Sequence, residues 1–336
     1  MTETMRPLAA GIVDFNLKRM SSEETAVHGI PDTLTQHLGD WRQYPPNIAH
    51  HFPEGILWFR SDQPWFFTRV MADEKLTQTL KKNDILILSG SGLSAHGFQQ
   101  GKASEEYRPA LERSQEVIRD LLGEGKWILG ICFGGQLAVH AVGGEIGRLP
   151  QGVTEAGWLT HELTTEGKED DVFGHLPNVF SAPHLHNDFV AKLPRIGTKI
   201  ASSSGEIEVT KADVLAIRHG YQDRDGLANG ERSYIMASVI EFSSGAKLYQ
   251  IQPHPEMATP EKANFLVRMN QWVANDSEMG QQYYDQALAV PNHVDFSVAQ
   301  TISNFVVAAQ RNLEDLRGIA FMKATLVQDL FQYLLK

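Results

Sequence analysis

The chain has 336 residues, of which 42% are hydrophobic and 21% are charged, which is the composition of a globular protein of one large domain or two. Its formal net charge of −11, without a local cluster of basic side chains, argues against binding to nucleic acid or to an anionic membrane. The apolar runs are strand-sized, far short of the roughly 20 residues that a membrane-spanning helix needs. With a single cysteine and no secretory signal pattern, the chain is expected in the cytoplasm.

Short apolar segments alternate with amphipathic ones in the first part of the chain. Residues 104–122 carry apolar side chains among charged ones, as an amphipathic helix does, and a second helix is expected directly after Cys132. Strands interleaved with helices predict a largely parallel sheet. The expected buried strands, all rich in Ile, Leu and Val, are residues 8–15, 55–59, 84–88 and 127–131.

After Val153 the pattern changes to shorter alternating segments separated by turn residues. These segments predict an antiparallel or mixed extension of the same sheet. A helix is expected over residues 260–274, after the capping residue Thr259. The strands expected in this part are residues 158–163, 179–182, 214–218, 234–242 and 247–252.

The last part of the chain is predicted to be a helical extension, because apolar residues recur at helical spacing from Val298 to Leu334. This apolar stripe is expected to be a packing surface within the subunit, or an interface with a partner or with a second copy in a homo-oligomer. The chain is therefore divided into a domain over residues 1–275 and an extension over residues 276–336.

The only cysteine of the chain lies between a predicted strand and a predicted helix, in the segment Gly130-Ile131-Cys132-Phe133-Gly134. Glycines two residues to either side allow a tight turn that holds the side chain at the strand tip, as in a nucleophile elbow. A helix N-terminus also favours the anionic form of a thiol. A free cysteine is usually a small buried hydrophobe, but the flanking glycines favour a nucleophile.

A cysteine that attacks an amide needs a base that later protonates the departing nitrogen. His254 is the candidate base, because Glu256 lies two residues further along an extended segment and can orient the imidazole from the same side. The chain has 13 histidines, so this pattern is weak alone and depends on its pairing with the cysteine elbow.

Together these motifs resemble the class I glutamine amidotransferase family. The resemblance rests on Gly-Ile-Cys-Phe-Gly-Gly-Gln-Leu at residues 130–137, Gln-Pro-His-Pro-Glu at 252–256, and a strand ending in Ser-Gly-Ser-Gly at 89–92 that is similar to the family's oxyanion loop. It covers roughly residues 8–274. It implies an α/β fold, namely a flavodoxin-like three-layer domain with a mostly parallel central sheet and a C-terminal helical appendage.

The resemblance implies an enzyme with the catalytic triad Cys132, His254 and Glu256. Cys132 would attack the side-chain amide of glutamine to give a thioester and ammonia, His254 would serve as base and acid, and Glu256 would hold His254. No cofactor and no metal are implied. The backbone N–H groups expected to stabilise the oxyanion are those of Ser91, Gly92 and Phe133, and the residues expected to bind substrate are Gly90, Gln136, Asn187 and Asp188.

Three functions remain open at this point. The first is a glutaminase that supplies ammonia to a separate synthase subunit, because the chain has no evident motif that would activate an acceptor. The second is a free-standing hydrolase of γ-glutamyl amides or peptides that uses the same triad. The third is an inactive relative kept for binding or assembly.

Two further patterns have competing explanations. His184, His186 and Asp188 alternate along one strand face and could ligate a metal, but no nearby Cys or Glu completes the set, so no metal site is predicted. Residues 89–94 are rich in glycine, but without Gly-Lys-Ser/Thr a nucleotide site is not expected.

Overall fold

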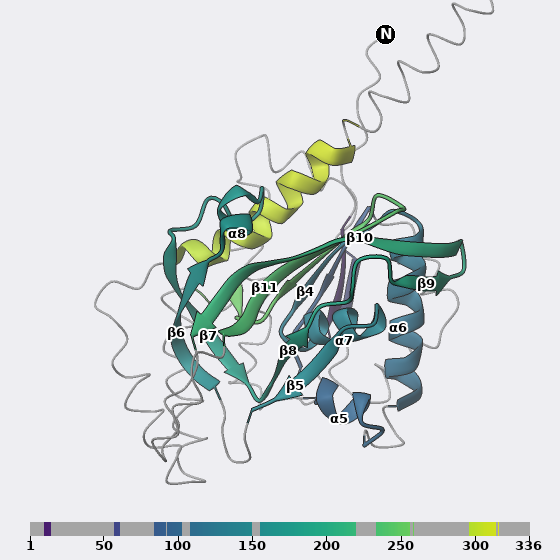
Figure 1. The fold of residues 1–336 in the computed structure, drawn as a ribbon, viewed down its shortest axis with the longest axis horizontal. Coiled ribbons are helices and arrows are strands. Elements are labelled where there is room, and N and C mark those ends of the chain that lie inside the picture. Colours follow the sequence, from purple (N-terminus) through teal and green to yellow (C-terminus); the bar gives the residue numbers. More distant parts are fainter. Residues whose placement is uncertain are drawn as a thin grey trace, which may run out of the picture.

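The computed structural model describes residues 10–14, 57–60, 84–91, 93–102, 108–149, 155–219, 233–255, 258, 296–313 and 315. These residues form a curved sheet of 12 strands with helices on both of its faces (Figure 1). None of the described helices is long and apolar enough to cross a membrane. The helix predicted over residues 260–274 lies outside the described residues.

Five parallel strands form one half of the sheet, in the order β2-β1-β3-β4-β12. This is the 2-1-3-4-5 order of flavodoxin-like sheets, in which ligands bind outside the carboxyl ends of the strands. All five strands were predicted from the sequence. Their bounds are Ala10–Asp14 (β1), Leu57–Arg60 (β2), Ile85–Leu88 (β3), Trp127–Ile131 (β4) and Lys247–Ile251 (β12).

The side chains of β3, β4 and β12 alternate between two buried clusters, one on each face of the sheet. Ile85 and Ile87 of β3 belong to one cluster and Leu86 and Leu88 to the other, because successive side chains of a strand point to opposite faces. All four are at most 2% exposed. Burial on both faces explains why these strands are continuous apolar runs in the sequence.

Helices cover both clusters. On one face lie α5 (Ala95–Gln99), α6 (Arg108–Gly123) and α7 (Phe133–Ala141), and the buried positions of α6 include Leu111, Val117 and Leu121. The other face is covered by the segment that follows α8 (Thr165–Glu169) and by a C-terminal helix. This helix consists of η2 (Phe296–Ala299) and the helical residues 300–313.

The other half of the sheet is antiparallel. Parallel pairing is limited to the five strands named above, so the predicted α/β class is confirmed but a mostly parallel sheet is not. The reason is the short connections, such as residues 243–246 between β11 and β12, which can join antiparallel strands but not parallel ones. These strands are β5 (Glu145–Arg148), β6 (Glu155–Leu163), β7 (Val179–His186), β8 (Asp188–Lys192), β9 (Lys199–Ser202), β10 (Gly205–His219) and β11 (Ser233–Phe242).

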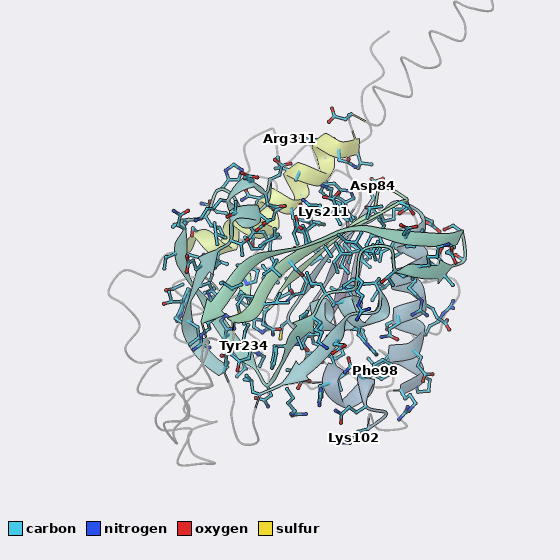
Figure 2. The ribbon with its side chains drawn as sticks, viewed as in Figure 1. Asp84, Phe98, Lys102, Lys211, Tyr234 and Arg311 are labelled. Atoms are coloured by element: carbon cyan, nitrogen blue, oxygen red, sulfur yellow. The ribbon has the colours of Figure 1, made fainter. Side chains whose placement is uncertain are left out.

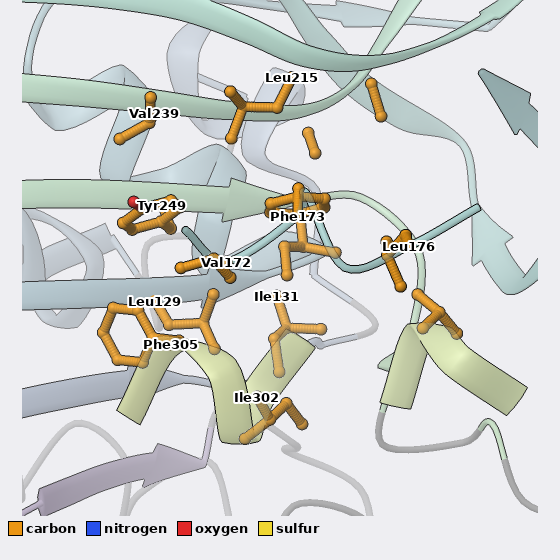
Figure 3. Close-up of a cluster of buried hydrophobic side chains, with 14 of the residues drawn as sticks. Leu129, Ile131, Val172, Phe173, Leu176, Leu215, Val239, Tyr249, Ile302 and Phe305 are labelled. Atoms are coloured by element: carbon orange, nitrogen blue, oxygen red, sulfur yellow. The ribbon is translucent and has the colours of Figure 1, made fainter. Parts of the chain in front are cut away.

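The described part of the C-terminal helix packs against the core of the sheet (Figure 3). The Phe305 ring lies 6.3 Å from the ring of Trp127 and 5.8 Å from that of Tyr249. Val298 and Ile302 are also at most 1% exposed, so the apolar stripe is a packing surface over these residues. Its remainder lies outside the described residues. An oligomer interface there, and the domain boundary after residue 275, stay predictions.

Replacing Phe305 with alanine should lower the free energy of unfolding by about 3–5 kcal/mol, the usual cost of a Phe-sized cavity in a core. Denaturant unfolding followed by circular dichroism measures this change. Arg311→Ala is the control, because Arg311 lies on the same helix (Figure 2) and is exposed. Equal stability of the two variants would mean that the helix does not belong to the core.

Candidate active site

Cys132 follows β4 directly and precedes the first residue of α7. Its φ of 49° is the only positive φ of a non-glycine residue in the part of the chain that the structure describes. Backbone conformations of this kind cost about 1–3 kcal/mol and collect at functional sites. The bend is held by two hydrogen bonds: Cys132 N–H donates to the Ile251 carbonyl at 2.7 Å, and the Cys132 carbonyl accepts from Gln136 N–H at 3.0 Å.

The glycines around Cys132 allow α7 to lie directly on the strands. A Cβ on Gly130 would lie 2.4 Å from the Gly135 Cα, and one on Gly134 would lie 2.7 Å from the Leu88 Cβ. Neither Gly130 nor Gly134 is among the residues with positive φ. These glycines are therefore needed for close approach of helix and strand, and the unusual backbone angle falls on the cysteine itself.

His254 lies near Cys132 because β12 and β4 are adjacent parallel strands whose carboxyl ends meet at one edge of the sheet. A Cβ on Gly90, just after β3, would lie 2.8 Å from His254 Cε1 and 3.6 Å from Cys132 Cβ. Gly90 is thus close to both the imidazole and the cysteine. The His254 N–H donates to the Pro183 carbonyl at 2.8 Å, which fixes the backbone of the histidine.

Cys132 is 4% exposed and His254 is 9% exposed, so both are buried. What distinguishes Cys132 from an ordinary buried cysteine is a polar neighbour: Gln252 Nε2 donates toward Sγ at 3.6 Å. A side-chain amide donor favours a sulfur that carries negative charge. Gln252 was not singled out from the sequence, although a residue two before His254 on an extended segment lies on the same side of the chain.

Gln136 connects this donor to the neighbouring strand β8. Its Nε2 donates to Gln252 Oε1 at 3.0 Å and to the Asp188 carbonyl at 2.7 Å. An amide nitrogen carries two hydrogens, so both donors of Gln136 are used inside the protein. The structure therefore brings Gln136, Asp188, Gln252 and Cys132 into one hydrogen-bonded chain.

The Asp188 carboxylate holds the start of α5 in place. Its Oδ2 accepts from Ser94 Oγ at 2.7 Å and from His96 N–H at 3.2 Å, and Arg148 Nε lies 3.7 Å from Oδ1. The carbonyl of Asn187 accepts from Leu149 N–H at 2.8 Å. Asp188 thus connects the proposed substrate-binding segment to the loop after β3.

The loop after β3 is organised by its own polar groups. Ser91 Oγ accepts from Leu93 N–H at 3.1 Å, and the Ser89 carbonyl accepts from Gly134 N–H at 3.1 Å. The second of these bonds ties the loop to the first turn of α7, which begins at Phe133. Gly92 and Glu256 lie outside the described residues, so their predicted roles stay predictions.

A second polar cluster lies on β6 and β7, next to the strand residue that accepts from His254. His184 Nε2 lies 2.7 Å from His161 Nε2, His184 Nδ1 lies 2.9 Å from His186 Nε2, and His186 Nε2 lies 3.0 Å from Glu155 Oε2. The guanidinium of Arg218 bonds the other Glu155 oxygen. Among the described residues, Glu155, His184 and His186 of this cluster could hold a metal ion.

Burial sets the charge of this cluster. It lowers the pKa of His161 to about 3, with the charge of Arg218 acting in the same direction, and it lowers the pKa of His184 well below its ordinary value. Burial acts to raise the pKa of Glu155, but the hydrogen bond from His186 and the charge of Arg218 outweigh it and lower that pKa. At pH 7 the cluster therefore holds neutral His161 and His184 beside a carboxylate.

A doubly wound sheet with a cysteine at a strand-to-helix elbow defines a class of α/β proteins with a nucleophile elbow. Residues 67–222 of this chain match the family model described as glutamine amidotransferase class-I. This match confirms the resemblance expected from the sequence: residues 67–222 are similar to class I glutamine amidotransferases. The matched residues include Cys132 and end before His254.

Curated relatives agree with this family. The chain is 29% identical over 160 residues to a subunit of the glutamine-hydrolyzing GMP synthase from Methanocaldococcus jannaschii, covering 48% of this chain and 66% of the relative. It is 26% identical over 247 residues to a gamma-glutamyl-L-1-hydroxyisopropylamide hydrolase from Pseudomonas sp, covering 72% of this chain and 66% of the relative. The chain thus spans slightly less than two thirds of either relative.

The fold is also found in solved structures. A crystal structure assigned as a GMP synthase subunit from Thermoplasma acidophilum superposes with a TM-score of 0.51 at 15% identity. The superposition covers 93% of this chain and 99% of the other. At this identity the likeness concerns the fold alone.

Removing the Gln252 amide should slow alkylation of Cys132 by iodoacetamide at pH 7. A hydrogen bond to a charged group contributes about 1.5–3 kcal/mol, so Gln252→Leu is expected to react roughly 10- to 100-fold more slowly. Gln252→Glu should react more slowly still, because it places a carboxylate beside the sulfur. Mass spectrometry of the modified protein gives the rates, and the single cysteine makes the modified site unambiguous.

Gln250→Leu is the matched control. Gln250 is a buried amide on β12, and it accepts a hydrogen bond from Ser238 and is not bonded to the sulfur. It should react at the wild-type rate. A wild-type protein whose cysteine does not react at all would show that the sulfur is closed to small electrophiles, which contradicts an active site at Cys132.

Proposed function

We propose that this chain is a cysteine-dependent glutaminase that releases ammonia from the side-chain amide of glutamine. One observation carries the proposal: Gly90 lies next to both Cys132 and the His254 ring, since a Cβ on Gly90 would lie 3.6 Å from Cys132 Cβ and 2.8 Å from His254 Cε1. A thiol and an imidazole at the ends of adjacent strands are the pair that amide cleavage through a thioester needs. The class I glutamine amidotransferase match supports the same chemistry.

In the proposed reaction His254 takes the thiol proton while Sγ of Cys132 bonds to the carboxamide carbon. The C–N bond then breaks, and His254 gives its proton to the nitrogen, which leaves as ammonia. Water, deprotonated by His254, attacks the glutamyl thioester, the C–S bond breaks, and glutamate leaves as the thiol regains its proton. Glu256 would orient the imidazole, and Gln252 would stabilise the negative charge on the sulfur, both when the thiol loses its proton and when the C–S bond of the thioester breaks.

Backbone N–H groups would stabilise the oxyanion of the tetrahedral intermediate. Phe133 is the first residue of α7, so its N–H lies at the positive end of the helix dipole. The N–H groups of Ser91 and Gly92, in the loop tied to α7 through Ser89, would complete the set. Removing one such donor typically costs about 2.7–4 kcal/mol of transition-state stabilisation.

Gln136, Asn187 and Asp188 would form the part of the site that receives the amino-acid end of glutamine. Because both donors of Gln136 are used within the protein, we propose that Gln136 shapes this part of the site through the Asp188 backbone. The Asp188 side chain would in turn keep the oxyanion loop at a fixed distance from it.

The relatives suggest two uses for this chemistry. The Methanocaldococcus jannaschii relative is by name one subunit of a glutamine-hydrolyzing synthase, which supports a role in supplying ammonia to a separate synthase subunit. The Pseudomonas relative is by name a γ-glutamyl amide hydrolase, and its match covers the larger share of this chain, 72% against 48%. A free-standing γ-glutamyl amide hydrolase is therefore the second candidate.

Turnover of the purified chain separates the two candidates. A free-standing hydrolase should cleave γ-glutamyl alkylamides without a partner and faster than glutamine, whereas a synthase subunit should prefer glutamine and be stimulated when its partner binds. In either case the chemistry needs no cofactor at Cys132, and the single cysteine fits the cytoplasmic location that we propose.

Cys132→Ala should lower ammonia release from glutamine by about 10⁴-fold or more, because it removes the nucleophile. His254→Ala should lose nearly as much, and Glu256→Gln less, since an orienting residue contributes less than the group that it holds. Ammonia release is measured by a coupled glutamate dehydrogenase assay. His175→Gln, at an exposed histidine, serves as the control and should keep full activity. Undiminished release by a folded Cys132→Ala protein would refute the proposal.

Gly90→Ala should also lower activity by roughly 10²-fold, because its Cβ would displace the His254 ring by an ångström or less, and misplacement on that scale costs about this much. Ser91→Ala, one residue further along, should lose much less, since the proposed contribution of Ser91 is its backbone N–H. Circular dichroism and a thermal melt of both variants check the fold. Equal losses in the two variants would contradict the role of Gly90 in leaving room for the His254 ring.

A further inference from the structure

The buried cluster on β6 and β7 has no role in the proposed reaction. Glu155 is 1% exposed, His184 is fully buried and His186 is 6% exposed. Each offers one ligand atom, and these atoms lie within 4.8 Å of one another. Charged and strongly polar groups are rarely placed so deep unless they are paired with one another or bind a metal.

Strand register brings these residues together. Glu155 of β6 pairs directly with His186 of β7, and His184 lies two residues away on the same face of β7. The sequence pattern suggested Asp188 as the third member of this set. In the structure the Asp188 carboxylate bonds Ser94 and His96 instead, and Glu155 from the neighbouring strand takes its place.

We propose that Glu155, His184 and His186 bind a divalent transition metal, with zinc as the preferred ion. The ligand atoms would be Glu155 Oε2, His184 Nδ1 and His186 Nε2. His186 Nε2 lies 3.0 Å from Glu155 Oε2 and 2.9 Å from His184 Nδ1, and the three atoms lie within 4.8 Å of one another. Zinc bonds of about 2.0–2.2 Å in tetrahedral geometry place ligand atoms roughly 3.3 Å apart, so the side chains would need to move only slightly to surround the ion. Two histidines and a glutamate are a known zinc ligand set, in which water fills the fourth position.

The residues that contact the three proposed ligands are of the kind that support ligands in metal sites. Metal-binding imidazoles commonly donate their second N–H to an acceptor that fixes the ring and its tautomer. His184 Nε2 faces His161 Nε2 at 2.7 Å, so His161 is placed to accept from the second N–H of His184. The remaining oxygen of Glu155 is held by Arg218, as ligating carboxylates commonly are.

The metal would have a structural effect on the active site. His184 directly follows Pro183, whose carbonyl accepts from the His254 N–H at 2.8 Å. Joining β6 and β7 through an ion would fix this carbonyl and hence the backbone of His254. The proposal does not depend on the glutaminase reaction, because the ligands and Cys132 are separate groups.

The test uses the full-length chain carrying Cys132→Ala, so that the thiol cannot bind metal. The protein is stripped with a chelator, incubated with Zn²⁺ or Co²⁺ and freed of excess ion. We expect one Zn²⁺ per chain by elemental analysis, the visible absorption of tetrahedral Co²⁺, and a higher melting temperature with Zn²⁺. No bound zinc and no Co²⁺ absorption in this protein would overturn the proposal, leaving the cluster as a chain of hydrogen-bonded imidazoles.

Variants then assign the ligands. Glu155→Gln and His186→Gln should each abolish the Co²⁺ absorption and the zinc-dependent rise in melting temperature. His161→Phe should keep one Zn²⁺ per chain but bind it about 10–100-fold more weakly, as expected for a group that supports a ligand. His175→Gln, at an exposed histidine, should bind as the parent does. Zinc binding that survives His186→Gln, or that is lost in His175→Gln, would place the metal elsewhere.

Should Glu155→Gln or His186→Gln not fold, the Co²⁺ spectrum of the parent still decides the matter. The Co²⁺ spectrum depends on the two nitrogen ligands and the oxygen ligand. We expect it to change in His161→Phe, because this substitution removes the imidazole that contacts His184. A Co²⁺ spectrum that is identical in the parent and in a folded His161→Phe protein, with equal affinity, would overturn the assignment.

Discussion

The close contact of α7 with the ends of β3 and β4 is the constraint on which the site depends. Gly130, Gly134 and Gly135 leave no Cβ between helix and strand, so the chain must turn from one to the other within a single residue. That residue is Cys132, which takes the strained backbone angle as a result. The same contact ties the loop after β3 to the helix, because Gly134 N–H in the first turn of α7 donates to the Ser89 carbonyl.

Strands of the antiparallel half of the sheet also place residues at the site beside the parallel strands. β12 belongs to both halves, because it pairs in parallel with β4 and in antiparallel fashion with β11. Gln252 and His254 follow directly after β12, so the amide beside the sulfur and the imidazole are placed by the strand that joins the two halves. β8 supplies Asp188, whose backbone and side chain reach two different parts of the site.

The sequence predicts those parts of this arrangement that local patterns determine. The five parallel strands are apolar runs and the cysteine elbow is marked by its glycines, so both could be found without knowledge of the fold. The share of antiparallel pairing and the position of Glu155 opposite His186 depend on which strands become neighbours, and no local pattern states this. Gln252 was overlooked for a related reason, since only the packing of β12 against β4 brings its amide to the sulfur.

Pro183 connects the two polar regions of the molecule. A proline has no backbone N–H, so its carbonyl is its one backbone hydrogen-bonding group, and here that carbonyl accepts from His254. The next residue, His184, lies at the centre of the buried cluster between His161 and His186. A shift of His184 can therefore move the His254 backbone through the Pro183 carbonyl. For this reason we propose that the β6–β7 pair positions His254, whereas the proposed bond cleavage takes place at the edge of the parallel strands.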